Sequence, residues 1–202
     1  MSVTARSAAK REAILHAAAD LFIEKGYDKV SVDAIVQEVG GSKANIYTYF
    51  GSKEGLFKAI VAHCCEELLE PLSRADIADL SPREALNAIG CRFLSVVLAP
   101  RTIALYRLVV SESPQFPKLG QLFYEAGPEV SFQRLAAYLS QQQAMGRLRS
   151  ADPKQAATQF FGMLLCYSQM RLLLAVTSPF SEEYIAALVE DAVEVFLKGY
   201  AQ

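Results

Sequence analysis

The residues of this chain with the most evident chemistry lie between Ser42 and Phe50, in the sequence SKANIYTYF. This segment is short, polar, aromatic and cationic, within a chain whose composition is 52% hydrophobic. Ser42 is suited to cap a helix, because its hydroxyl can accept a hydrogen bond from an unpaired amide. Ile46 and Phe50 lie four residues apart, so they share one helical face and can anchor the helix to a small core.

The remaining faces of this helix carry an unusual density of hydrogen-bonding side chains. A cation suits the phosphates of a nucleic acid, and amide and hydroxyl groups suit the base edges of the major groove. The net charge of the chain is -2, so a DNA footprint must be local. The residues available for contact with DNA are Lys43, Ala44, Asn45, Tyr47, Thr48 and Tyr49.

Two further helices are predicted before this one. Residues 8–25 have apolar side chains at helical spacing and end at Gly26, a usual helix terminator. Ser31 then caps a second helix, which Gly40 and Gly41 close. Two short helices joined by a glycine turn, the second with a polar outer face, are typical of a helix-turn-helix.

The basic segment at residues 4–11 is either a flexible arm along DNA or has no role in binding.

A fourth helix is predicted to begin directly after this unit, with Ser52 as its cap and Lys53 in its first turn. The helix dipole favours an anion at this end, so a lysine there is poorly placed for its own helix. The neighbouring backbone amides can bind a phosphate. The position of Lys53 therefore indicates that an anion binds at this site.

The run SVDAIVQEVGGSKANIYTYFGSKEGLF resembles the DNA-binding domain of the TetR family of one-component bacterial regulators. The shared order is G-x-S-K-x-x-[LI]-Y-x-[YH]-F-x-[ST]-K-E-x-[LI], and the resemblance covers about fifty residues. One departure is Gly41, where the family usually has an apolar residue, and we expect a looser turn there. The resemblance implies that Asn45 and Thr48 read bases and that Ala44 allows close approach.

The same resemblance implies roles for the other polar residues of this region. Phosphate or backbone contacts are expected at the two helix starts and from the tyrosines. The implied DNA-binding set is Ser31, Ser42, Lys43, Ala44, Asn45, Tyr47, Thr48, Tyr49 and Lys53.

The rest of the chain is predicted to be helical as well. Ser81 and Glu84 have the spacing of a capping box, with Pro82 at the first helical position. Prolines then punctuate the chain, so that residues 118–125 and 129–143 form either separate helices or one bent helix. Further helices are expected at about residues 82–98, 101–111, 153–174 and 181–199.

Parts of this second region resemble the AefR-like C-terminal domain of one branch of TetR regulators. The similar segments are residues 105–127, 146–148 and 152–161. The resemblance implies a ligand-responsive, dimeric domain. We therefore predict an all-α fold, with a three-helix helix-turn-helix DNA-binding domain at residues 1–52 and a larger helical bundle for ligand binding and dimerisation at residues 53–202.

Of the last two long helices, the first carries apolar residues around more than one face and the second is lined by them, which suits either a dimer interface or an intrachain core. The family resemblance favours a two-fold four-helix interface. Its expected residues are Phe160, Gly162, Met163, Tyr167, Met170, Tyr184, Leu188 and Val195.

An effector pocket is expected among aromatic residues of the middle helices, with an aromatic-rich core as the alternative. The expected lining is Phe93, Tyr106, Arg107, Phe116, Phe123, Tyr124 and Tyr167. No feature of these residues specifies the chemical class of the effector.

The remaining reactive residues do not form a recognisable catalytic or metal-binding pattern. The four cysteines lack a CxxC pair, and His16 and His63 do not complete a metal site with them. Cysteines are usually small buried apolar residues, with redox sensing by Cys64, Cys65 or Cys91 as the open alternative. We expect no catalytic residues, no metal and no cofactor, and therefore not an enzyme.

Neither a secretion signal nor a membrane span is predicted. The N-terminus lacks an apolar core segment, and no run of eighteen apolar residues occurs without polar interruption. A cytoplasmic location is therefore expected.

The helix-turn-helix pattern and the family resemblance together imply a homodimeric repressor that binds double-stranded operator DNA and is released by an unknown small-molecule effector. A two-fold dimer implies a palindromic operator with half-sites about 34 Å apart, or a multiple of that. The alternatives are an activator, and a helical protein-interaction module that has lost DNA binding.

Overall fold

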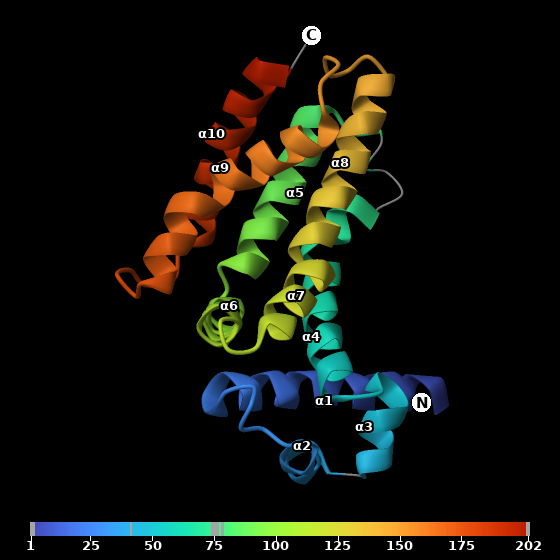
Figure 1. Ribbon diagram of the computed structural model, residues 1–202. Coiled ribbons are helices and arrows are strands. Elements are labelled where there is room, and N and C mark those ends of the chain that lie inside the picture. The colour runs from blue at the N-terminus through green and yellow to red at the C-terminus, as the bar shows by residue number, and fades with distance from the viewer. Residues whose placement is uncertain (1–2, 41, 74–76, 78, 201–202) are drawn as a thin grey trace. The chain divides into compact units, whose positions relative to one another are not determined.

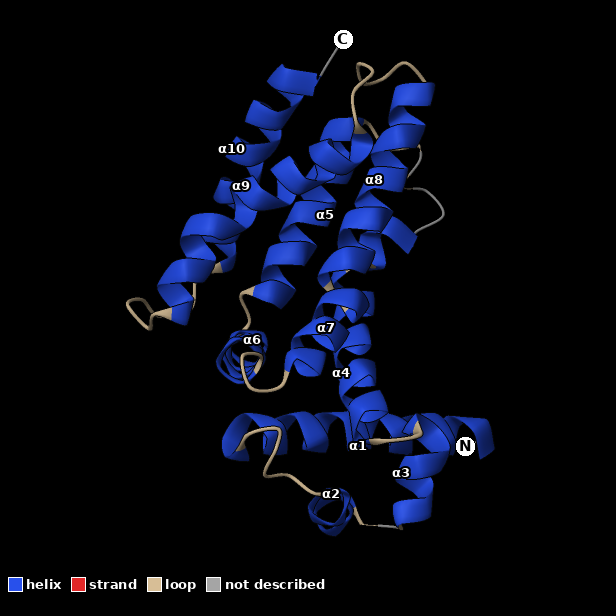
Figure 2. Cartoon of the chain, viewed as in Figure 1, coloured by secondary structure: helices blue, strands red, loops and turns tan. Residues whose placement is uncertain are grey.

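The computed structural model describes residues 3–40, 42–73, 77 and 79–200, with the backbone alone for residues 3–6. Every regular element within these residues is a helix, which confirms the predicted all-α fold (Figures 1 and 2). A short 3-10 helix spans Glu70–Ser73. The α-helices are α1 Val3–Lys25, α2 Val32–Val39, α3 Lys43–Phe50, α4 Lys53–Leu68, α5 Pro82–Val97, α6 Pro100–Glu112, α7 Pro117–Ala126, α8 Pro128–Ala144, α9 Pro153–Leu173 and α10 Glu182–Tyr200.

By packing, the chain divides into two compact units. Unit 1 comprises Met1–His63 and Ala104–Gly127, and unit 2 comprises Cys64–Ile103 and Pro128–Gln202. This division differs from the predicted boundary after residue 52, because apolar side chains of α6 and α7 lie in the same core as those of α1. The functional boundary at residues 52 and 53 stays a prediction.

The core of unit 1 is built around three aromatic rings. The ring centroid of Tyr27 lies 5.1 Å from that of Phe22 and 5.4 Å from that of Phe57. Ile46 from α3 joins the same cluster and is 1% exposed. The predicted anchoring of α3 by Ile46 is therefore confirmed, and Phe50 packs against the cluster while partly exposed.

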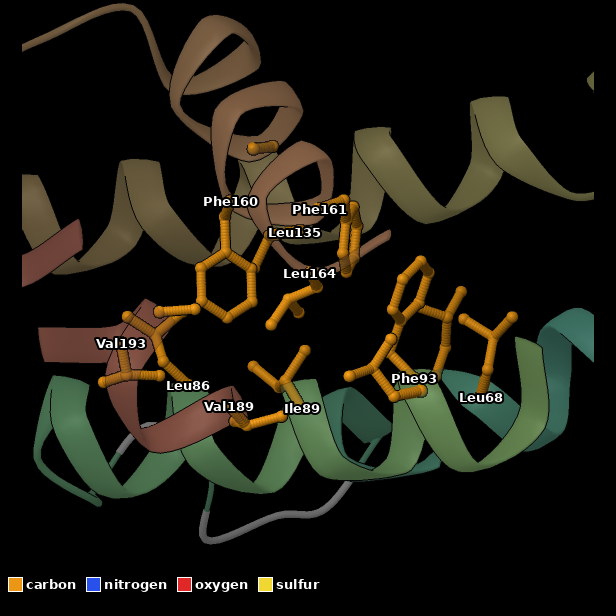
Figure 3. Close-up of a cluster of buried hydrophobic side chains, with 14 of the residues drawn as sticks. Leu68, Leu86, Ile89, Phe93, Leu135, Phe160, Phe161, Leu164, Val189 and Val193 are labelled. Carbon is orange, nitrogen blue, oxygen red and sulfur yellow. The ribbon is translucent and has the colours of Figure 1, made fainter. Parts of the chain in front are cut away.

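The core of unit 2 lies among α5, α8, α9 and α10 (Figure 3). Phe93 of α5 stacks on Phe161 of α9 with ring centroids 4.1 Å apart. In Figure 3, Leu164 of α9 points toward Ile89 of α5. The residues labelled there are Leu68, Leu86, Ile89, Phe93, Leu135, Phe160, Phe161, Leu164, Val189 and Val193.

Local capping signals position several helices as expected. The amide of Glu84 donates to Ser81 Oγ at 3.3 Å, and the amide of Ser81 donates to Glu84 Oε2 at 2.9 Å. These two bonds confirm the predicted capping box. Before α9, Asp152 Oδ1 accepts from the amide of Lys154 at 2.9 Å. α7 and α8 are separate helices on either side of Gly127.

The N-terminal segment differs from one of its expected forms. α1 begins at Val3 rather than near residue 8, so residues 4–11 have helical backbone in this structure. The expected loosening at Gly41 lies outside the described residues.

Among the described residues, no single helix is both long and apolar enough to cross a membrane. By length and composition alone, α5 and α6 together pass the same test, as a pair bent by 66°.

We predict that Gly90→Ala lowers the free energy of unfolding by about 1–3 kcal/mol, because it overpacks a filled core. A Cβ at Gly90 would lie 2.7 Å from Val189 Cγ1, and a valine side chain yields little at χ1. Urea unfolding at fixed protein concentration measures the change.

The matched control is Gly199→Ala, which lies in α10 where an added Cβ meets nothing within 4 Å. This variant should be unchanged or more stable by up to about 1 kcal/mol, since alanine favours helix over glycine. Equal stability of Gly90→Ala and the native chain would contradict the close approach of α5 and α10.

Candidate nucleic-acid interface

The helix-turn-helix of unit 1 presents α3 with one face buried and the other exposed. Ile46 lies in the core, whereas Asn45 is partly buried. Figure 1 shows α2 and α3 on the same side of α1. The predicted DNA-contacting residues that are exposed are Ser31, Ser42, Lys43, Ala44, Tyr47 and Thr48.

Two contacts from α1 hold the C-terminal half of α3. The Tyr49 hydroxyl lies 3.0 Å from Ser7 Oγ, within hydrogen-bond distance. The Arg11 guanidinium lies over the Phe50 ring, 5.4 Å from its centroid. Tyr49 is therefore a partly buried residue that ties α3 to α1, in addition to its predicted role on the DNA backbone.

Lys43 forms an ion pair with Asp33 of α2. Its Nζ lies 2.8 Å from Asp33 Oδ2, and both side chains are more than half exposed. The hydrogen bond from Lys43 to Asp33 and the attraction between the two charges raise the pKa of Lys43. The pair links the two helices of the motif, and a phosphate would compete with Asp33 for the ammonium.

Lys53 is held against the loop between α1 and α2. Its Nζ donates to the carbonyl of Asp28 at 3.3 Å and lies 4.3 Å from the centroid of the Tyr27 ring. Burial lowers the pKa of the Lys53 ammonium, and burial raises the pKa of the Tyr27 phenol. Lys53 occupies the first turn of α4 as predicted.

The two serines at helix starts differ in what their hydroxyls do. Ser31 Oγ accepts from the amide of Ala34 at 3.2 Å, so it caps α2. Ser42 occupies the N-cap position of α3, but its side chain makes no cap hydrogen bond. The predicted capping role of the Ser42 hydroxyl is therefore wrong in this structure. That hydroxyl is exposed and not used to cap its own helix.

A contact from α6 also supports the loop between α1 and α2. Glu112 Oε1 accepts from the amide of Tyr27 at 3.0 Å, although the two residues are 85 positions apart. Gly26 precedes this amide with φ +90°, and a Cβ there would lie 2.9 Å from Glu112 Oε1. Sequence reasoning missed Glu112, because no local pattern marks a residue whose partner is so distant.

The predicted pocket residues fall into both units. Within unit 1, the rings of Tyr106 and Phe123 stack with centroids 5.6 Å apart, and Phe116 packs beside the core. Phe93 and Tyr167 belong to unit 2, where Phe93 is buried and Tyr167 is 63% exposed. The other predicted lining residues are Arg107 of α6 and Tyr124 of α7, and both are exposed.

Most of the predicted dimer residues lie on an exposed apolar surface of α9 and α10. We define the α9/α10 face by its exposed members Gly162, Met163, Tyr167, Met170, Tyr184 and Val195. Leu188 is partly buried at its edge. The prediction that Phe160 lies in the dimer interface is wrong. Phe160 is 0% exposed and its ring centroid lies 5.3 Å from that of Phe196, so it is a core residue of unit 2.

The cysteines with a possible redox role lie in protected surroundings. Cys65 is buried, and Cys64 and Cys91 are partly buried. Burial raises the pKa of all three thiols, which disfavours the reactive thiolate.

Comparisons with known proteins match both parts of the chain. The family described as AefR-like transcriptional repressor, C-terminal domain, matches residues 84–202, and the family described as bacterial regulatory proteins, tetR family, matches residues 14–60. Among curated relatives, the HTH-type transcriptional regulator RutR of Escherichia coli strain K12 is 39% identical over 75 residues. That match spans 36% of this chain and only 35% of RutR.

Solved structures resemble the chain over nearly its whole length. A TetR-family transcriptional regulator from Mesorhizobium loti MAFF303099 has a TM-score of 0.79 at 28% identity, covering 98% of this chain and 99% of its own. The flavonoid-responsive regulator FrrA has a TM-score of 0.74 at 35% identity, covering 96% of this chain and 98% of its own. The chain therefore belongs to the TetR family of bacterial transcriptional regulators, with a helix-turn-helix DNA-binding domain at its N-terminus and an AefR-like domain at its C-terminus.

Proposed function

We propose that this chain is a cytoplasmic, ligand-responsive repressor that binds a palindromic operator as a homodimer and is released by a small-molecule effector. The observation that carries this proposal is the outer side of α3, where polar and aromatic side chains are exposed while Ile46 is buried beneath them. A helix held in this way can enter a major groove without losing its core contacts.

On DNA, the side chains of α3 divide between phosphates and bases. Asn45 is suited to the paired donor and acceptor of adenine, and Thr48 to the methyl group of thymine. Tyr47 is 50% exposed and can hold the backbone. The ammonium of Lys43 leaves its ion pair with Asp33 and binds a phosphate. The exposed hydroxyl of Ser42 offers a further phosphate contact.

The α9/α10 face supports dimerisation. Tyr167, Met170 and Val195 are 63%, 49% and 61% exposed, and large exposed apolar patches mark interaction sites. At Gly162 an added Cβ would meet nothing within 4 Å, so another backbone can approach α9 closely there. We propose a two-fold interface between α9 and α10 of two chains, which gives the dimer two copies of α3, one for each half-site of the operator.

Release by an effector is supported by the name of a relative and by one contact. FrrA, a relative over nearly the whole chain, is described as flavonoid-responsive. The bond from the Tyr27 amide to Glu112 joins α6 to the loop that precedes α2. A ligand that prefers one position of α6 would then favour one arrangement of the helix-turn-helix, which is a population shift.

Two other functions would use the same surfaces. A protein-interaction module would keep the exposed α3 but show no salt-dependent binding to DNA. An activator would bind DNA in the same way, and transcription from the target promoter would fall when the chain is removed. The description of the C-terminal family as a transcriptional repressor favours repression. We propose no catalytic role.

Operator recognition is tested with DNA from upstream of the gene for this chain, in mobility shifts at several salt concentrations. Asn45→Ala and Thr48→Ala should each weaken binding by about 1–3 kcal/mol per half-site, because each removes a base contact. Lys43→Ala should weaken binding to all sequences and reduce the salt slope by about 1 per half-site.

The matched control for the loss of charge is Lys154→Ala, an exposed lysine at the start of α9. It should bind DNA like the native chain. Unchanged affinity in a combined Lys43, Asn45, Tyr47 and Thr48 to alanine variant would show that α3 does not read DNA.

Dimerisation is tested with a lysine at an apolar position of the α9/α10 face. Met170→Lys should raise the dimer Kd by about 30-fold or more, because a buried charge costs at least about 2 kcal/mol at an interface centre. Sedimentation over a range of protein concentrations measures this change. Met145→Lys is the control, since Met145 is exposed to the same extent, 49%, but lies outside this face. Equal dimer stability of the two variants would contradict the interface.

The link from α6 is tested at Glu112. Glu112→Ala leaves the Tyr27 amide without its acceptor, so the unfolding free energy should fall by about 1–3 kcal/mol and operator binding should weaken. Glu112→Gln keeps an acceptor oxygen. Its unfolding free energy and its operator affinity should therefore lie between those of Glu112→Ala and the native chain. Glu125→Ala, on α7 of the same unit, is the control. Native operator affinity in Glu112→Ala would separate this contact from DNA binding.

A further inference from the structure

Three potential metal ligands from two helices converge in unit 1. They are Glu12 and His16 of α1 and His63 of α4, and their ligand atoms all lie within 4.8 Å of one another. His16 and His63 are the two histidines of the whole chain. Although they are 47 positions apart, their ring centroids lie 5.8 Å apart in an edge contact.

The helical arrangement explains why these side chains meet. Glu12 and His16 are four residues apart, so they lie on one face of α1. His16 Nε2 is 3.8 Å from Glu12 Oε1. Figure 1 shows α1 crossing α4, which brings His63 to the same face. All three residues belong to unit 1, so the cluster is a property of that unit alone.

We propose that Glu12, His16 and His63 bind a divalent transition metal ion, with Zn²⁺ as the expected occupant and water in a remaining position. Two imidazoles and one carboxylate are a usual ligand set for Zn²⁺, and such three-ligand sites keep one position open. Imidazole also suits copper and nickel, so related divalent ions should compete.

The geometry requires only a small side-chain adjustment. Ligand atoms of a tetrahedral zinc site lie about 3.4 Å apart when the metal–nitrogen distance is about 2.1 Å. The present separations of up to 4.8 Å therefore need to shorten by at most about 1.4 Å. Glu12 and His16 are exposed, so rotation about their side-chain bonds can supply this movement.

The contact between Glu12 and His16 accounts for only part of the arrangement. Such a pair on an exposed helix needs no third residue, yet His63 joins it from another helix.

The competing ligand nearest in sequence is Cys64, whose thiolate is disfavoured because burial raises its pKa. The exposed Cys166 is a separate candidate for adventitious zinc.

The test is a titration of the full chain with Zn²⁺ in competition with a chromophoric chelator, together with NMR of the imidazole protons. We expect one tight Zn²⁺ per chain and shifts of both histidine signals. His16→Gln and His63→Gln should each weaken binding by more than about 100-fold, since even changes outside the ligand sphere cost about 10- to 100-fold. Glu12→Gln should weaken binding by at least about 10-fold.

The matched controls are Glu24→Gln, an exposed glutamate elsewhere on α1, and Cys166→Ser. Both should bind Zn²⁺ like the native chain. Absence of tight binding by the native chain, native affinity in His16→Gln, or loss of binding in Cys166→Ser would each overturn the proposal. Because none of these measurements uses DNA, the outcome is independent of the proposed repressor function.

Discussion

The exposed surface of the helix-turn-helix depends on the burial of Ile46. α3 has only eight residues, too few for a stable isolated helix in water. Burying one isoleucine contributes about 1.5–3 kcal/mol, whereas ordering each residue of backbone costs about 1–2 kcal/mol. The remaining stability must come from other contacts, and the structure supplies them at both ends of α3. Asp33 holds Lys43 at the start, and Ser7 and Arg11 of α1 hold the end.

In unit 2, one helix supplies both the core and the exposed apolar surface. Phe160, Phe161 and Leu164 of α9 point into the core, while Met163 and Tyr167 lie on the outer side. Apolar residues therefore surround the helix, and periodicity alone cannot tell the two sides apart. For this reason the sequence pattern places Phe160 among the interface residues. Its burial follows from where α5 and α10 pack, which is a non-local property.

The features that the sequence predicts correctly depend on residues that are close together along the chain. The helix starts at Ser31, Ser81 and Asp152 follow from a few neighbouring residues, and all three caps form. The family pattern around α3 is equally local. The contacts that sequence reasoning missed join distant parts of the chain, such as Glu112 with Tyr27 and His16 with His63. The same cause explains why packing divides the chain elsewhere than after residue 52, since α7 finds its core partners in the first helices.

The ion pair between Asp33 and Lys43 also has a kinetic consequence for a protein that searches DNA. In the proposed complex with DNA, a phosphate that took Lys43 would replace one anion with another and leave the Asp33 carboxylate without its ion pair. The cost is the same for every sequence, so it leaves the ratio of specific to non-specific affinity unchanged. The cost would speed dissociation from each wrong site, because weaker complexes differ mainly in their off-rates. A regulator with this exchange would sample more of the genome in a given time.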